Sequence, residues 1–221
     1  MRLIFPFAVG LLLLLLPSTA AAADVSLALS PSDSVQYGSS HDAGGRLTEG
    51  TVPLAGQPVE LHGRAYPYRG AFRRLATATT DAAGGFAFRR RFDRNMQLRA
   101  IAPVQAIRSK TVRAYVFPRP RSTFKALDGD RLRITQVLRA PAGVRLTART
   151  NFYLGPRGAR SARRVASAKP RKIGRGRFKA TAVVELPRRW KGSFRYGSCF
   201  GYSEGSGLGD PSAGCPDRYR F

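Results

Sequence analysis

Short runs in which apolar and polar residues alternate are the feature that most constrains the fold of this 221-residue chain. Val25, Leu27 and Leu29 alternate in this way, and Phe86 and Phe88 begin another such run. Side chains of a β-strand point alternately to its two faces, so a period of two predicts strands with one buried face. Beyond the first 23 residues no sustained helical spacing of apolar residues is found, and Gly, Pro, Asp and Ser separate the runs. We therefore predict an all-β fold.

Residues 1–23 have the pattern of a secretory signal peptide. Arg2 supplies the positive charge, an apolar run extends from Leu3 to Leu16, and Ala21–Ala23 offers a small-residue cleavage site before Asp24. The run is shorter than the roughly 20 residues that a membrane-spanning helix needs. We predict cleavage and a product that is secreted or associated with the cell envelope. An uncleaved membrane anchor is the alternative.

The two cysteines, Cys199 and Cys215, lie close together near the end of the chain. An exported protein folds in an oxidising environment, so we predict that they form a disulfide. A metal site built on the two thiolates is the alternative, but no histidine lies near either of them in the sequence. We predict no metal and no cofactor.

The density of predicted strands divides the chain. Residues 24–117 contain six or seven short runs, as expected for a β-sandwich. Two prolines at 118 and 120 predict a stiff linker over 118–122. Alternation resumes over 123–221, where we predict a second sandwich with a C-terminal loop closed by the disulfide. The predicted architecture is two tandem Ig-like antiparallel β-sandwiches after a cleaved signal peptide.

Several motifs in the first predicted sandwich resemble bacterial extracellular Ig-like modules, including the carboxypeptidase-regulatory-like and transthyretin-like sandwiches. The segments that carry the resemblance are Val35–Gly38, Gly45–Leu47, Pro53–Leu61 and Ala76–Phe88. It covers residues 30–103 and implies turns at Gly56 and Gly84. It transfers no catalytic residues, because such modules usually act as spacers or binding accessories beside other domains.

Positive charge is concentrated in the second half of a chain whose net charge is +25. From Arg131 to Val184 there are 15 Lys and Arg residues and no acid. The preference for Arg over Lys is typical of a GC-rich genome, which does not explain the shortage of acids. We place Arg145 and Arg149 on the solvent face of one strand and 157–177 in a basic loop or hairpin. The predicted anion-binding residues are Arg145, Arg149, Arg163, Arg164, Arg171, Lys172, Arg175 and Arg177.

A surface of this kind attracts anionic polymers and orients them as they approach. The predicted partner is an anionic envelope polymer or a lipid surface, and the alternative is a well-solvated surface with no dedicated partner. The export signal and the absence of interleaved aromatic residues argue against nucleic acid. The function we predict is that of a non-enzymatic, exported binding or structural protein of the cell envelope.

One sequence motif is typical of a hydrolase. Residues 201–205 match G-x-S-x-G, the nucleophile-elbow pattern, with Ser203 at its centre. The chemistry requires a histidine later in the chain, but His41 and His62 both precede it, and we interpret them as isolated surface residues. We predict that the protein is not an enzyme. A secreted hydrolase or an accessory subunit of an extracellular enzyme is the alternative, and a membrane-permeabilising cationic toxin is a third reading.

Overall fold

The computed structural model describes residues 25–31, 34–190, 193–203, 205–212 and 214–221. Within these ranges the chain is all-β, and its only helical element is a 3₁₀ turn, η1 (Arg188–Trp190). The fold class predicted from the period-two pattern is therefore confirmed. The predicted signal peptide, 1–23, lies outside the described residues. Among the helical segments of the described part, none has the length and apolar character needed to cross a membrane.

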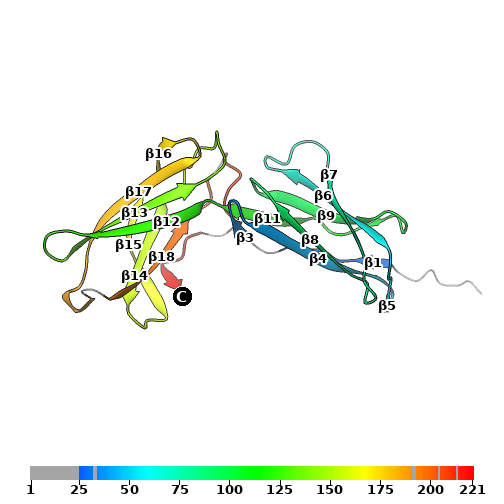
Figure 1. Cartoon of the computed structure of the whole chain (residues 1–221), viewed down its shortest axis with the longest axis horizontal. Helices are drawn as coiled ribbons and strands as arrows, with labels where there is room; N and C mark the ends of the chain where they lie inside the picture. Colours follow the sequence, from blue (N-terminus) through cyan, green and yellow to red (C-terminus); the bar gives the residue numbers. More distant parts are fainter. Residues whose placement is uncertain (1–24, 32–33, 191–192, 204, 213) are drawn as a thin grey trace, which may run out of the picture.

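Residues 25–117 form two sheets (Figure 1). In the first, β1, β2, β5 and β8 all pair with β4, and the second has the order β3–β11–β9–β6–β7, with β10 paired to β9. The strands are β1 (Val25–Leu27), β2 (Ser30–Pro31), β3 (Ser34–Gln36), β4 (Ser40–Glu49), β5 (Val52–Pro53), β6 (Pro58–Ala65), β7 (Arg73–Thr79), β8 (Gly85–Arg91), β9 (Met96–Ala102), β10 (Ile107–Arg108) and β11 (Val112–Phe117).

One pairing departs from the antiparallel arrangement that the sequence predicts. β3 runs parallel to β11, with Val35 opposite Val116. A parallel pair cannot be joined by a hairpin and needs a long connection. Here the connection is the chain from β4 to β10, which supplies strands to both sheets. It is long enough for β3 to lie parallel to β11.

The two sheets share one hydrophobic core. Leu61 on β6 and Leu98 on β9 belong to the same buried cluster as Leu47 on β4 and Phe86 on β8. Burial alternates along β6 and β9, as the sequence pattern predicts. Burying a side chain of this size stabilises the fold by about 1.5–3 kcal/mol, so the facing sheets hold each other in place.

Strand β4 contains two consecutive glycines, Gly44 and Gly45. A Cβ atom at Gly45 would lie only 1.9 Å from the backbone oxygen of Ala28 and 2.7 Å from Cζ of Phe86. Glycine is needed here because neighbouring chain segments approach so closely. His41 lies on this strand and is 1% exposed, with its ring centroid 5.3 Å from that of Phe92. The prediction of a surface His41 is therefore wrong.

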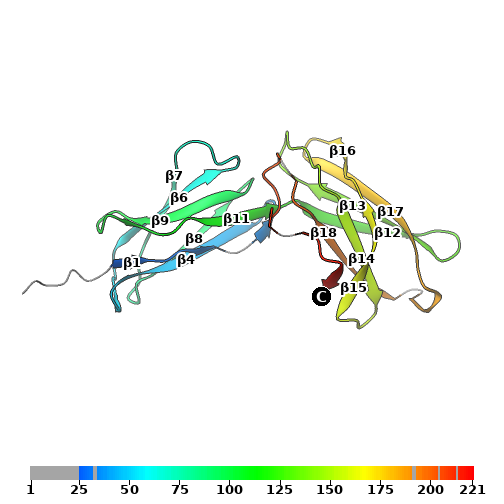
Figure 2. The same ribbon diagram turned by 180° about the vertical axis from the view of Figure 1, so that it is seen from behind.

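Residues from 119 onward form two four-stranded sheets, of order β12–β13–β17–β16 and β18–β14–β15–β19 (Figure 2). Ile134, Phe152 and Trp190 belong to a buried cluster that the two sheets share. The strands are β12 (Arg119–Ala126), β13 (Arg131–Arg139), β14 (Thr150–Pro156), β15 (Ser161–Ala168), β16 (Arg171–Gly174), β17 (Arg177–Glu185), β18 (Phe194–Phe200) and β19 (Arg218–Arg220).

The proline-rich linker predicted over 118–122 is mostly strand. β12 begins at Arg119, which lies opposite Arg139 of β13, and the pairing continues to Ala126. β12 is an edge strand of its sheet, and an edge position tolerates Pro120 because one row of its N–H groups has no partner strand. The linker prediction is therefore wrong beyond Pro118, and the chain passes directly from β11 into β12.

A short C-terminal segment, residues 207–209, packs against the first half of the chain, and we call it the connecting segment. Leu208 is fully buried in the same core cluster as residues of β9 and β11. Asn95, 1% exposed, donates its backbone N–H to the Gly207 carbonyl at 2.7 Å and its side-chain amide to the Gly209 carbonyl at 2.6 Å. Its Oδ1 accepts the N–H of Val116 at 2.9 Å, and the N–H of Gly209 donates to the Val116 carbonyl at 2.8 Å. Buried contacts therefore hold the halves together.

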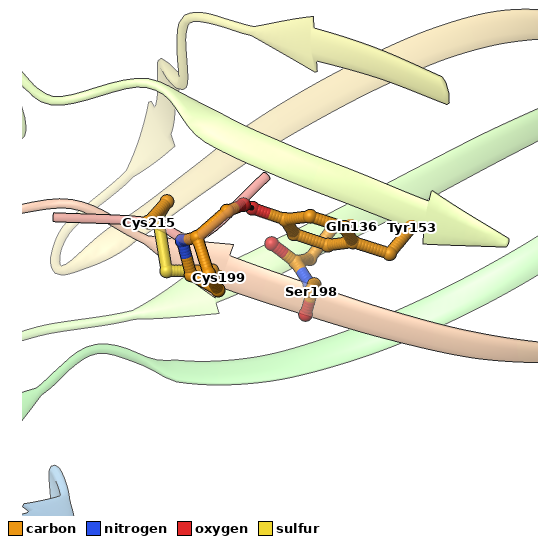
Figure 3. Close-up of a disulfide and its surroundings, with 6 residues drawn as sticks. Gln136, Tyr153, Ser198, Cys199 and Cys215 are labelled. Carbon is orange, nitrogen blue, oxygen red and sulfur yellow. Dashed lines mark hydrogen bonds between the residues drawn. A yellow bond between two sulfur atoms is a disulfide. The ribbon is translucent and has the colours of Figure 1, made fainter. Parts of the chain in front are cut away.

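The disulfide closes the loop that contains this connecting segment. Cys199 on β18 is bonded to Cys215, with their Cα atoms 5.6 Å apart (Figure 3), as the sequence predicts. Beyond the bond, the Tyr153 hydroxyl donates to the Pro216 carbonyl, and β19 then pairs with β15. The loop is thus anchored at both ends to the second pair of sheets.

Candidate anion-binding face

The outward face of the sheet β12–β13–β17–β16 collects basic side chains from all four strands. Even-numbered residues such as Ile134 and Ala180 are buried, whereas the odd-numbered residues of β13 and β17 project away from the core. The strand register brings the odd-numbered side chains of the four strands to one side, where Glu185 is the only acid among them. We call this surface the basic face; its cations are Arg119, Arg121, Lys125, Arg131, Arg133, Arg139, Arg171, Arg177 and Lys179.

These cations lie in rows that cross the strands. Arg119, Arg139 and Arg177 are direct neighbours on three adjacent strands. In the next row Arg121 and Lys179 flank Val137, and Arg171 follows on the far side of Lys179. Neighbouring strands are about 4.8 Å apart, and successive rows are about 6.8 Å apart along a strand. The basic face therefore presents a two-dimensional array of cations at short, regular spacings.

Such an array carries electrostatic repulsion between its direct neighbours. Like charges directly opposite each other on adjacent strands destabilise a sheet, by up to about 1 kcal/mol per pair. Among the described residues, five ion pairs meet the 4 Å limit, and none of them includes a cation of the basic face. The row of Arg119, Arg139 and Arg177 is therefore not neutralised by any acid in the described part of the chain.

A shallow depression of about 480 Å³ lies at the β16 side of the sheet. Lys169, Arg171 and Lys179 line it, together with the Thr181 hydroxyl and the exposed Ile173. Cationic and hydroxyl groups around a hollow surface suit the oxygens of phosphate or carboxylate groups.

The structure divides the eight predicted anion-binding residues into two groups. Arg171 and Arg177 lie on the basic face, and Lys172 and Arg175 are exposed at its edge, in β16 and in the turn that follows it. The predicted basic loop or hairpin over 157–177 is wrong, because β15 and β16 belong to different sheets.

The other four lie outside the basic face. Arg163 and Arg164 are on β15, with the Arg163 guanidinium 5.9 Å from the centroid of the Trp190 ring and Arg164 paired with Asp217 at 3.2 Å. Arg149 donates to the hydroxyl and carbonyl oxygens of Ser167, at 2.9 and 2.8 Å. Arg145 and Arg149 are exposed, as the alternation predicts, but the segment that carries them is not a strand.

Seven cations of the basic face were not among the predicted residues: Arg119, Arg121, Lys125, Arg131, Arg133, Arg139 and Lys179. A signal for them exists in the sequence, because basic and apolar residues alternate from Arg131 to Ile134 and basic residues recur at alternate positions from Arg119 to Arg121. Because 118–122 was predicted to be a linker, the cations of β12 were not assigned to a sheet. The anion-binding site was instead predicted over 157–177, where basic residues are densest in the sequence.

Ser203 has a structural environment unlike that of a nucleophile. Its side chain is fully buried, and Oγ accepts the N–H of Thr147 at 2.8 Å and lies 3.3 Å from the Arg145 carbonyl. The residue forms an isolated bridge with Leu208 rather than a strand-to-helix turn. The hydroxyl therefore fastens the segment 145–147 against the connecting segment.

We expect Ser203→Ala to lower the free energy of unfolding by about 1–2 kcal/mol, because the Thr147 N–H loses its buried acceptor. Urea denaturation followed by circular dichroism measures the change. Ser167→Ala is the control, because Ser167 accepts only an exposed arginine side chain, and its effect should stay below about 0.5 kcal/mol. Unchanged stability in Ser203→Ala would contradict the structural role.

The remaining titratable candidates do not assemble into a site. His62 lies half-buried on β6 and contacts Glu60 at 2.7 Å, which in turn binds Arg74 at 2.9 Å. Hydrogen bonds from His62 and Arg74 lower the pKa of Glu60. Within the described ranges, His, Cys, Asp and Glu residues form no group of three that could hold a metal.

Comparison of the chain with models of known protein families and with curated proteins found no match in either case.

Proposed function

We propose that this is a non-enzymatic, exported protein that binds an anionic polymer of the cell envelope through the basic face. The observation that carries the proposal is the unneutralised row of Arg119, Arg139 and Arg177, extended by cations in the neighbouring rows. A bound polymer would remove the repulsion within these rows and so gain affinity that an isolated surface charge cannot provide.

The shape of the face favours a polymer. It is the surface of a twisted sheet, so an extended chain can contact several rows at once. Each exposed ion pair contributes about 0.2–1 kcal/mol, so useful affinity requires many such contacts. The odd-numbered positions of the four strands that are not charged are Thr123, Thr135, Val137, Ile173, Thr181 and Val183. Because this set lacks aromatic rings, it offers no base-stacking platform, which argues against single-stranded nucleic acid.

The test is co-sedimentation of the purified protein with isolated bacterial envelope across a salt series. A variant with Arg119, Arg133, Arg139 and Lys179 changed to Gln should bind roughly ten- to a hundredfold more weakly, because the basic face loses four of its nine cations. Binding of the unmodified protein should weaken steadily as salt is raised, since the exposed charges are screened.

A charge-matched variant separates the basic face from net charge. Arg73, Arg90, Arg91 and Arg108 are exposed and lie in the first half of the chain, so changing them to Gln removes the same charge elsewhere. This control should keep most of its affinity. Equal losses in both variants, or no binding at low salt, would reject the proposal. If the protein binds phosphatidylglycerol vesicles but not envelope from which the lipid has been extracted, the partner is a lipid surface instead.

A further inference from the structure

A second cavity, of about 480 Å³, lies between the edge strands β12 and β18, where β3 and the start of β12 meet. Gln36, Phe117, Gln136, Ser198, Phe200 and Tyr219 are among the residues that line it. Pockets for small ligands commonly measure about 300–1,000 Å³. The cavity is on the inner side of the sheet whose outer side is the basic face, so the two surfaces are separate.

The lining of this cavity is uncharged. None of its twelve lining residues is Asp, Glu, Lys, Arg or His, although 23% of the chain is charged. An ionised ligand would find no charged side chain lining this cavity to compensate its lost hydration, and that loss is costly. The chemistry of the lining therefore selects a neutral ligand.

A buried polar wall forms one side of the cavity. Gln136 is 1% exposed, and its side-chain nitrogen lies 2.7 Å from Ser198 Oγ, 3.2 Å from the Tyr196 hydroxyl and 3.3 Å from Ser122 Oγ. Ser122 Oγ also donates to the Tyr196 hydroxyl at 3.1 Å, so the amide and the three hydroxyls form one hydrogen-bonded cluster behind the cavity. Figure 3 shows Gln136 and Ser198 next to the disulfide.

Aromatic rings form the apolar part of the cavity lining. Phe117, Phe200 and Tyr219 line the cavity, as does the apolar edge of Pro118 and Pro120. The positions are rigid, because Gln136 and Ser198 lie on paired strands and Cys199 is held by its disulfide. Aromatic rings beside fixed hydroxyl and amide groups match a ligand that has an apolar face and a rim of hydroxyls.

We propose that this cavity binds a neutral sugar unit. The C–H face of a pyranose ring packs against the aromatic side chains, and its hydroxyls exchange hydrogen bonds with Ser198, Gln136 and Gln36. The proposal does not rest on the basic face, because it uses other residues on the other side of the sheet.

Saturation-transfer NMR on the purified full-length protein tests this with a panel of uncharged probes: glucose, galactose, mannose, N-acetylglucosamine and their β-linked disaccharides. At least one should receive saturation and compete with the others, whereas glucuronate should bind more weakly than glucose. Titration calorimetry then gives the affinity of the best probe. Absence of transfer to every neutral probe, or a preference for glucuronate, would overturn the proposal.

Two variants locate the site. Ser198→Ala removes the hydroxyl without adding atoms to the cavity, and Gln36→Ala truncates an exposed residue at the rim. Each should weaken binding roughly three- to tenfold, as expected for the loss of one hydrogen bond. Gln97→Ala, on β9 and not among the residues that line the cavity, should leave binding unchanged. If Ser198→Ala fails to fold, Gln36→Ala still decides the outcome, and unchanged affinity in the variants that fold would place the sugar elsewhere.

Discussion

Asn95→Ala is expected to lower the free energy of unfolding by about 2–4 kcal/mol. The side chain occupies the buried contact between the two halves, where it donates to the Gly209 carbonyl and accepts from the Val116 N–H. Truncation removes both hydrogen bonds and leaves two buried backbone groups without a partner. The cost of each is the full desolvation of that group, which exceeds the net value of an ordinary hydrogen bond.

The measurement is guanidinium chloride denaturation monitored by circular dichroism and by the fluorescence of Trp190, the single tryptophan. Because Trp190 is buried in the second core cluster, its signal reports on the second half of the chain. Asn151→Ala is the comparison, since Asn151 is half-buried on β14 and makes none of the contacts of Asn95 with Gly207, Gly209 and Val116. We call the contact of Asn95 with Val116, Gly207 and Gly209 the junction. A change below about 1 kcal/mol in Asn95→Ala would mean that the junction contributes little to stability.

Changing both Cys199 and Cys215 to Ser is expected to cost about 3 kcal/mol, the value that chain entropy gives for a loop of this length. The loop carries Leu208 and the two carbonyls that Asn95 binds, so a freed loop would leave the junction more easily. Thermal unfolding of the double variant, compared with that of the unmodified protein with and without reductant, measures the loss.

Combining these changes tests whether the disulfide acts through the junction. If both restrain the same segment, the loss in the triple variant should be smaller than the sum of the two separate losses, by more than about 0.5 kcal/mol. Additive losses would show that the disulfide stabilises the second pair of sheets independently of Asn95. Unfolding that is insensitive to reductant would contradict the structural importance of the bond.

The success of the strand predictions came from local patterns. β6, β8 and β9 bury alternate side chains because a pleated strand directs them to opposite faces, and the sequence shows that period directly. The turn at Gly84 is equally local, because Asp81 Oδ1 accepts the N–H groups of Ala83 and Gly85 at 2.9 and 2.8 Å. The disulfide followed from the number of cysteines and the predicted compartment.

The failures occurred where partners distant in the chain decided the structure. Gly44 and Gly45 lie inside β4, and at Gly45 Ala28 and Phe86 approach too closely for any other residue. Pro120 resembles a linker residue, yet it is tolerated in β12 because β13 pairs with only one side of that strand. Neither neighbour is close in sequence, so no local pattern indicates it.

The candidate sites illustrate the same division. The sequence by itself determined that the chain is all-β and that positive charge gathers in its second half, because alternation and composition are local properties. Only the tertiary structure decided that Arg119, Arg139 and Arg177 form one row and that Arg163 and Arg164 lie on another sheet. The register of strands far apart in the chain sets which charges become neighbours, and that register is fixed by the packing of the sheets around a common core.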